Sequence, residues 1–139
     1  MDKRFWLSVL TLFVLSLALG FVVHGLVLGP KYAELTTLFR PPAEQQARFL
    51  WILLAHALVA LGFTWIYRKG LELGKPVLGQ GVRFGLAIAV LMTIPTYLIY
   101  YAVQPMPGPL VAMQIVGDGI TVVLMGVAAA WINRPPRTA

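Results

Sequence analysis

One aspartate and two histidines lie inside long apolar stretches of this chain, and they are its best candidates for chemistry. Asp118 stands within the apolar residues 110–132, and His24 and His56 lie in two other such stretches. A carboxylate near the centre of a membrane helix costs about 2.5–3.5 kcal/mol on insertion scales, so Asp118 should face protein rather than lipid. Such carboxylates commonly handle protons, coordinate ions or bind substrates. The alternative is a structural hydrogen bond or ion pair that fixes the helices.

Further polar side chains are expected at a similar depth in the same half of the molecule. At about 1.5 Å per residue, His24 and Gln114 lie about 6 Å below the outer ends of their helices, and His56 and Asp118 about 11–12 Å below. Tyr97 belongs to the outer half of a third helix. The candidate ligand- or ion-binding residues are therefore His24, His56, Tyr97, Gln114 and Asp118.

Helical spacing gives these residues shared faces. Ser16, Gly20 and His24 follow one another at four-residue intervals, and so do Gln114 and Asp118. Residues four apart lie on one side of an α-helix, so each helix has a polar or small-residue stripe that can point inward.

The same side chains raise the question of a metal or haem. His24, His56 and Asp118 could supply three ligands to zinc and leave the fourth position open. Haem held by two histidines needs them at similar heights, and the difference of about 5 Å between His24 and His56 disfavours it. The cofactor therefore stays unknown, with haem and zinc possible and neither favoured. The chain has no cysteine, and no motif pairs a nucleophile with a base, so we do not expect an enzyme.

Composition defines the elements that must position these groups. Of the 139 residues, 59% are hydrophobic and 12% are charged, whereas soluble domains carry about 25% charged residues. A helix needs about 20 apolar residues to cross a bilayer. Four stretches qualify, at about 5–28, 49–67, 84–103 and 110–132. We expect one all-α domain over residues 1–139, a polytopic membrane protein with four transmembrane helices in an antiparallel bundle.

Charge predicts the orientation of these helices. The net charge of +6 reflects basic residues beside the apolar stretches and does not indicate nucleic-acid binding. The positive-inside rule places both termini in the cytoplasm. The first apolar stretch is longer than a usual signal-peptide core, so we expect it to be retained. Lys31, Arg40 and Arg48 fall on the outer side, and eight basic residues fall on the other: Lys3, Arg4, Arg68, Lys69, Lys75, Arg83, Arg134 and Arg137.

The connections differ in character. In the outer loop, Tyr32, Leu35, Leu38 and Phe39 recur at near-helical spacing, which predicts a short interfacial helix on the membrane surface. Residues 41–44 are typical of a helix start, so the second helix should extend outward. The cytoplasmic residues 71–82 are glycine-rich and should be irregular. Pro95 should kink the third helix just below Tyr97.

Several runs of sequence resemble a family of small proteins. They are residues 93–101, residues 114–119 followed by Gly126 and Trp131, and residues 20–25 leading into 28–32. Together they resemble a set of small bacterial four-helix integral membrane proteins catalogued as a domain of unknown function. The resemblance implies the four-helix fold and a bacterial inner membrane, and it implies no activity. His24 stands where related chains often carry another residue, so no role is inherited for it.

Three classes of function remain open. The first is a non-catalytic accessory protein of a larger membrane complex, or a homo-oligomer, in contact with the lipid bilayer. The second is a bundle or carrier that binds a small ligand or ion at the outer-half residues. The third is a metal or haem protein. We favour them in that order.

Overall fold

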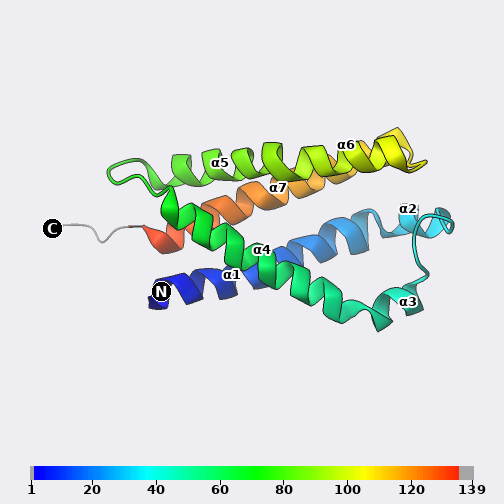
Figure 1. Ribbon diagram of the computed structural model, residues 1–139, viewed down its shortest axis with the longest axis horizontal. Coiled ribbons are helices and arrows are strands. Elements are labelled where there is room, and N and C mark those ends of the chain that lie inside the picture. The colour runs from blue at the N-terminus through cyan, green and yellow to red at the C-terminus, as the bar shows by residue number, and fades with distance from the viewer. Residues whose placement is uncertain (1, 135–139) are drawn as a thin grey trace.

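The computed structural model describes residues 2–134, which form helices joined by short connections (Figure 1). Arg137, one of the basic residues counted above, lies outside the described residues. No strand occurs between residues 2 and 134. The elements in chain order are α1 Lys3–Gly20, the π-helix η1 Phe21–Val27, α2 Gly29–Glu34, α3 Pro42–Ala47, α4 Phe49–Lys69, α5 Val77–Ile88, the π-helix η2 Ala89–Thr93, α6 Ile94–Val103 and α7 Gly108–Asn133.

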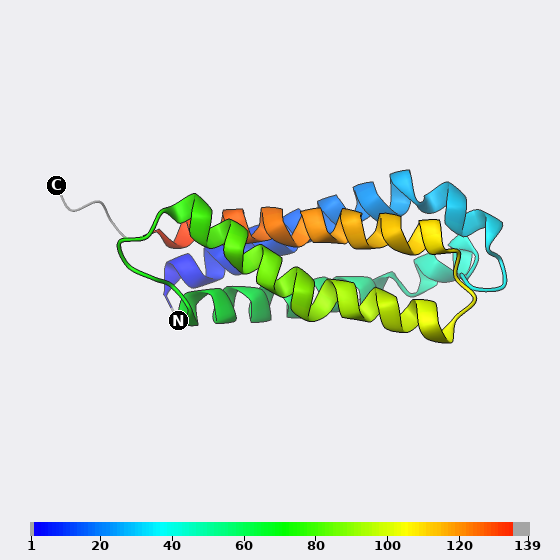
Figure 2. The ribbon, with the colours of Figure 1, turned by 90° about the horizontal axis from the view of Figure 1, so that it is seen from above.

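Four continuous helical segments are long and apolar enough to cross a membrane. They are Lys3–Val27, Phe49–Lys69, Val77–Val103 and Gly108–Asn133. This confirms the prediction of an all-helical chain with four apolar helices of spanning length. The N-terminus, the α4–α5 connection and the end of α7 lie at one end of the molecule, and α2, α3 and the α6–α7 turn lie at the other (Figures 1 and 2).

The four segments pack unevenly. α5 lies along α7, and α1 contacts both α4 and α7. α4 diverges from α6 and α7 toward its α3 end (Figure 1). No residue of α4 from 49 to 59 is buried, whereas Ala60, Phe63, Thr64 and Tyr67 are. The α3 half of α4 is therefore covered less by the rest of this chain than its other half.

Glycines bring α5 and α7 into backbone contact. A Cβ added at Gly81 would lie 2.7 Å from the Gly126 carbonyl oxygen, and one at Gly85 would lie 2.7 Å from the Val122 oxygen. Small residues four apart permit this approach between membrane helices. We expected residues 71–82 to be irregular, but α5 begins at Val77. That expectation is wrong for residues 77–82 because these glycines serve helix packing rather than a flexible loop.

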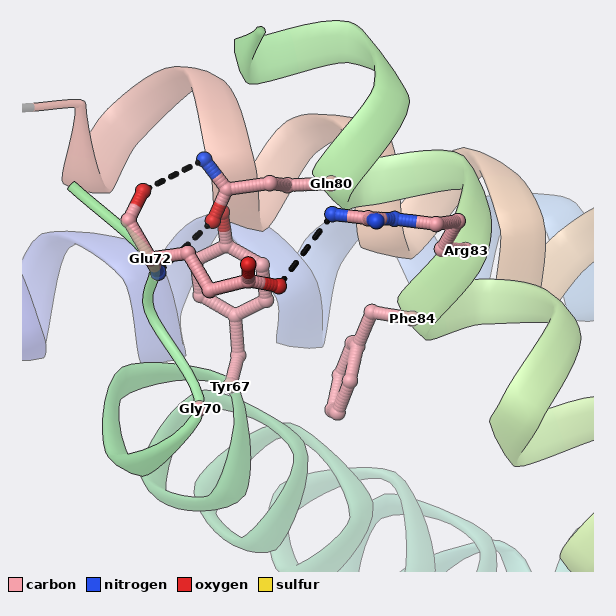
Figure 3. Close-up of a pocket in the computed structure, with 6 residues that line it drawn as sticks. All are labelled: Tyr67, Gly70, Glu72, Gln80, Arg83 and Phe84. Carbon is pink, nitrogen blue, oxygen red and sulfur yellow. Dashed lines mark hydrogen bonds and ion pairs between the residues drawn. The ribbon is translucent and has the colours of Figure 1, made fainter. Parts of the chain in front are cut away.

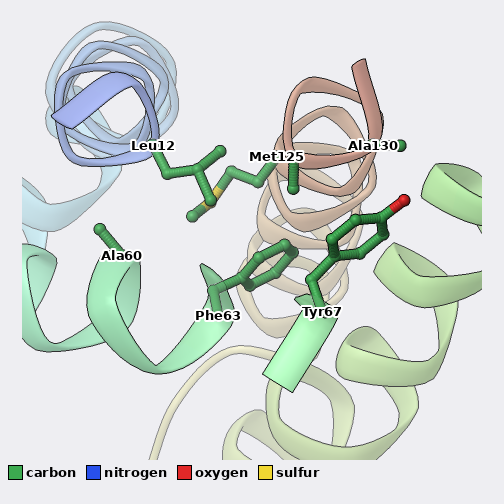
Figure 4. Close-up of a cluster of buried hydrophobic side chains, with 7 residues drawn as sticks. Leu12, Ala60, Phe63, Tyr67, Met125 and Ala130 are labelled. Carbon is green, nitrogen blue, oxygen red and sulfur yellow. The ribbon is translucent and has the colours of Figure 1, made fainter. Parts of the chain in front are cut away.

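The main core lies between α1, α4 and α7 in the half that contains the N-terminus (Figure 4). Its members are Leu12, Ala60, Phe63, Tyr67, Met125, Ala129 and Ala130. Beside it, the buried Ser8 hydroxyl accepts hydrogen bonds from Thr64 Oγ1 at 3.4 Å and Asn133 Nδ2 at 3.2 Å. This small polar network joins the same three helices.

The outer loop differs from its prediction. α2 ends at Glu34, and Leu38 and Phe39 form a turn whose amides donate to the Leu35 carbonyl. The loop's apolar side chains pack against a second core of Leu28, Met106, Leu110 and Val111. A helix does begin at Pro42, but this helix, α3, ends at Ala47 and is separated from α4 by Arg48. Burial against protein atoms explains the apolar spacing that predicted a surface helix.

The glycine contact predicts a large difference between two otherwise similar substitutions. Gly85→Ala should destabilise the protein by about 1–3 kcal/mol because the methyl group must push two helix backbones apart. Gly62→Ala is the control, since a Cβ at Gly62 meets nothing within 4 Å. Unfolding in mixed detergent micelles measures both. Equal stabilities of the two variants would contradict the role given to the α5–α7 contact.

Candidate functional site

The Asp118 carboxylate is held by side chains from two other segments. Tyr97 of α6 donates its hydroxyl proton to Oδ2 at 2.5 Å. His24 of η1 lies with Nε2 3.0 Å from Oδ1, and this is the ion pair that the structure gives Asp118 within the described residues. The carboxylate on α7 is thereby tied to η1 and α6, as expected for a charged group that must avoid lipid.

The network continues from His24 toward the outer loop. His24 Nδ1 lies 2.7 Å from the Tyr32 hydroxyl, and Gln114 Nε2 donates to the same hydroxyl at 3.1 Å. If Tyr32 donates to Nδ1, the imidazole is neutral, and its Nε2 proton points to Asp118. Gln114 then donates to Tyr32, Tyr32 donates to His24, and His24 donates to the Asp118 carboxylate.

The helices on either side of the network contain π-helical turns. His24 lies within η1, Phe21–Val27, and η2, Ala89–Thr93, ends just before Pro95. Proline has no amide hydrogen and clashes with the preceding turn, and the wider i→i+5 turn accommodates it. Pro95 and η2 thus set the position of Tyr97 on the following turn.

Four of the five predicted residues meet in this network, and His56 does not. His56 Nδ1 lies 2.9 Å from Ser16 Oγ, and Ser16 donates its own proton to the Phe13 carbonyl. Gly20 leaves room for the imidazole, since a Cβ there would lie 3.3 Å from His56 Cε1. The described partner of His56 is therefore a serine on α1.

Tyr32 is the site residue that sequence reasoning did not include. It had been assigned to a surface helix, although it follows His24 by two helical turns. Burial raises the pKa of the Tyr32 phenol, an effect opposed by the Gln114 hydrogen bond and reinforced by the negative charge of Asp118. The phenol therefore stays neutral and keeps the proton that it can donate to His24.

The network is not sealed. The side chains of His24 and Asp118 are 35% and 24% exposed. Gln114 is only 4% exposed, yet its Oε1 has no hydrogen-bond donor among residues 2–134. Asp118 is therefore accessible to a ligand, and Gln114 Oε1 can accept a hydrogen bond. Both features suit a ligand that donates hydrogen bonds.

The donors fit a metal or haem poorly. Both ring nitrogens of His24 already face protein partners, and His56 Nδ1 is bonded to Ser16. In the described part of the chain, no three His, Cys, Asp or Glu side chains are grouped to hold a metal ion. The zinc set of His24, His56 and Asp118 is thus not brought together, and we derive no chemistry from it.

Comparison of the chain with models of protein families, with curated proteins and with solved structures finds no match. The four apolar helices are those of a candidate multi-pass membrane protein. Its function must be argued from the site alone.

Tyr32→Phe tests the network through its dependence on pH. At neutral pH the variant should lose about 1–3 kcal/mol because His24 Nδ1 and Gln114 Nε2 lose their partner. A raised pKa means that the folded state favours the neutral phenol. The stability that Tyr32 contributes is therefore complete below its ordinary pKa of 10.0 and declines as pH rises above that value. Unfolding midpoints of the two proteins should therefore converge at high pH.

Tyr101→Phe is the matched control, since Tyr101 is 52% exposed at the outer end of α6. It should leave stability unchanged across the same pH range. A Tyr32→Phe deficit that is independent of pH up to alkaline conditions would contradict the assignment.

Proposed function

We propose that this chain is a small multi-pass protein of the bacterial inner membrane, with four antiparallel spans and both termini in the cytoplasm. The distribution of Lys and Arg supports this orientation, and the resemblance to uncharacterised four-helix bacterial proteins supports the membrane. The short helices α2 and α3 would then lie at the outer interface.

We further propose that the outer-half network binds a small cation that donates hydrogen bonds, such as a primary ammonium group. The observation that carries this proposal is the charge of Asp118, whose one ion-pair partner among the described residues is an imidazole. When His24 is neutral, the network has a net negative charge in a low-dielectric region. A carboxylate without a full counter-charge is costly in such a region, and a bound cation removes that cost.

The free acceptors indicate the chemistry of the cation. Each Asp118 oxygen accepts one hydrogen bond from the protein, which leaves lone pairs unused. Gln114, one turn nearer the start of α7, contributes an Oε1 that has no donor among residues 2–134. Acceptors one helical turn apart favour a group with several N–H bonds over a cation that has none.

Access to the site comes from the incomplete burial of its ion pair. The side chains of His24 and Asp118 are 35% and 24% exposed. A small cation from the outer side can reach the carboxylate without opening the main core, which lies toward the other end.

Methylammonium and tetramethylammonium provide a direct test, because both carry one positive charge and only the first has N–H donors. Methylammonium should raise the unfolding midpoint of the purified protein, by up to about 2.7 kcal/mol in free energy at a hundredfold excess over Kd. Tetramethylammonium should have no such effect. Thermal unfolding in detergent, followed by tryptophan fluorescence, measures both.

Asp118→Asn is the decisive variant, since it removes the charge and keeps the shape. It should fold and lose the response to methylammonium. Tyr101→Phe is the matched control, because Tyr101 is 52% exposed and makes no contact with the network among the described residues, and its response should equal that of the wild type. Equal responses to the two cations, or a full response in Asp118→Asn, would exclude this function.

A non-catalytic accessory role is the second candidate. It is favoured by residues 49–59 of α4, none of which is buried, so most of this surface is free to contact another membrane protein or a second copy. Sizing in a mild detergent tests it: we expect a protein mass above the 15.3 kDa of one chain. A stable monomer purified with its native lipids would count against this role.

A further inference from the structure

We propose a second binding site, for a phosphate group, in a cavity at the opposite end of the molecule from the Asp118 network. The cavity has a volume of 210 Å³ and lies between the end of α4, the α4–α5 connection and the start of α5 (Figure 3). It is lined by Tyr67, Gly70, Glu72, Gln80, Arg83 and Phe84.

Gln80 fixes the wall of this cavity. Its Oε1 accepts from the Glu72 amide at 2.9 Å, and its Nε2 donates to the Glu72 carbonyl at 2.9 Å and the Lys75 carbonyl at 3.2 Å. The side chain is buried, so these bonds are shielded from competing water. The α4–α5 connection is thereby attached to the first turn of α5, and the cavity is formed before any ligand arrives.

Tyr67 provides a hydroxyl that lacks a partner. Its side chain is 3% exposed, and the oxygen has no hydrogen bond to any residue between 2 and 134. The ring is held edge-on against Phe84, with centroids 5.3 Å apart. A buried hydroxyl without a partner is unfavourable, and an acceptor oxygen in the cavity would satisfy it.

Arg83 supplies the positive charge. Its Nη2 lies 3.2 Å from Glu72 Oε1, and both side chains are more than half exposed. An exposed pair of this kind is weak, so an incoming anion can displace the Glu72 carboxylate. Arginine has five N–H donors, and it binds phosphate oxygens with two of them at once. Glu72 now occupies the position that a phosphate oxygen would take.

The surroundings favour an anion of this type. Lys69 and Lys75 flank the α4–α5 connection, and this end is the cytoplasmic one in the orientation proposed above. Phosphate at this level can come from a lipid headgroup or from a soluble compound. Both offer the same oxygen acceptors to Tyr67 and Arg83, so the site is defined by the phosphate group and the source is left to experiment.

Binding to the purified full-length protein in detergent tests the site. One arm measures inorganic phosphate by titration calorimetry. The other measures retention of phosphatidylglycerol against diacylglycerol, which lacks phosphate, by native mass spectrometry. Binding in the first arm alone assigns a soluble phosphate compound, and selective retention in the second assigns a lipid. Absence of binding in both arms overturns the proposal.

Three variants should change the affinity in specified directions. Tyr67→Phe, which keeps the ring, should weaken binding about tenfold through loss of a hydrogen bond to a charged group. Arg83→Gln should weaken it by a similar factor or more. Glu72→Gln should strengthen it several-fold, because it removes a competing carboxylate.

Two controls separate this site from other effects. Arg134→Gln removes a basic side chain from the same end of the molecule and should leave phosphate affinity unchanged. Asp118→Asn should also leave it unchanged, so failure of the cation site and failure of this site are distinguishable. Unchanged affinity in both Tyr67→Phe and Glu72→Gln would mean that the cavity holds only water. Arg83 is exposed, so Arg83→Gln remains informative if Tyr67→Phe does not fold.

Discussion

The half of this protein that contains α2 and the α6–α7 turn depends on how one carboxylate is held by its neighbours. Asp118 accepts hydrogen bonds from Tyr97 and His24, and these contacts tie α7 to α6 and η1. Tyr32 extends the tie to α2 in the outer loop. The cost of an unpaired charge in hydrocarbon makes these contacts obligatory. The same contacts leave the charge only partly compensated, so the group that fixes these elements is also the group best able to attract a ligand.

Hydrophobicity predicted the fold well because it acts over whole helices. Four apolar stretches of spanning length become four helices whatever their internal details, since lipid offers the backbone no other partner. Glycine was harder to interpret. The glycines of residues 71–82 suggested an irregular loop, yet one of them, Gly81, lies in α5 against Gly126. Whether a glycine loosens a loop or brings two helices together depends on the element that faces it, and one sequence does not contain that information.

Four-residue spacing predicted which site residues lie together wherever the helix is a regular α-helix. Gln114 and Asp118 lie on a regular helix, and both join the network as their spacing predicted. Ser16, Gly20 and His24 were expected to share one face. Ser16 and Gly20 do face His56 on α4, but η1 begins at Phe21 and widens the turn, and His24 faces Asp118 instead. A single π-helical segment therefore directs His24 away from His56. No residue type in the sequence predicts such a segment.

The two polar networks of this protein differ in charge and in burial. The Ser8, Thr64 and Asn133 network also joins several helices, but its members are neutral and its side chains are 0%, 0% and 6% exposed. Neutral, sealed hydrogen bonds are sufficient to fix membrane helices. The Asp118 network instead contains an ion pair, remains partly exposed and leaves Gln114 Oε1 without a donor among residues 2–134. Helix packing requires none of these three features, and they are the features on which the proposal of a cation site rests.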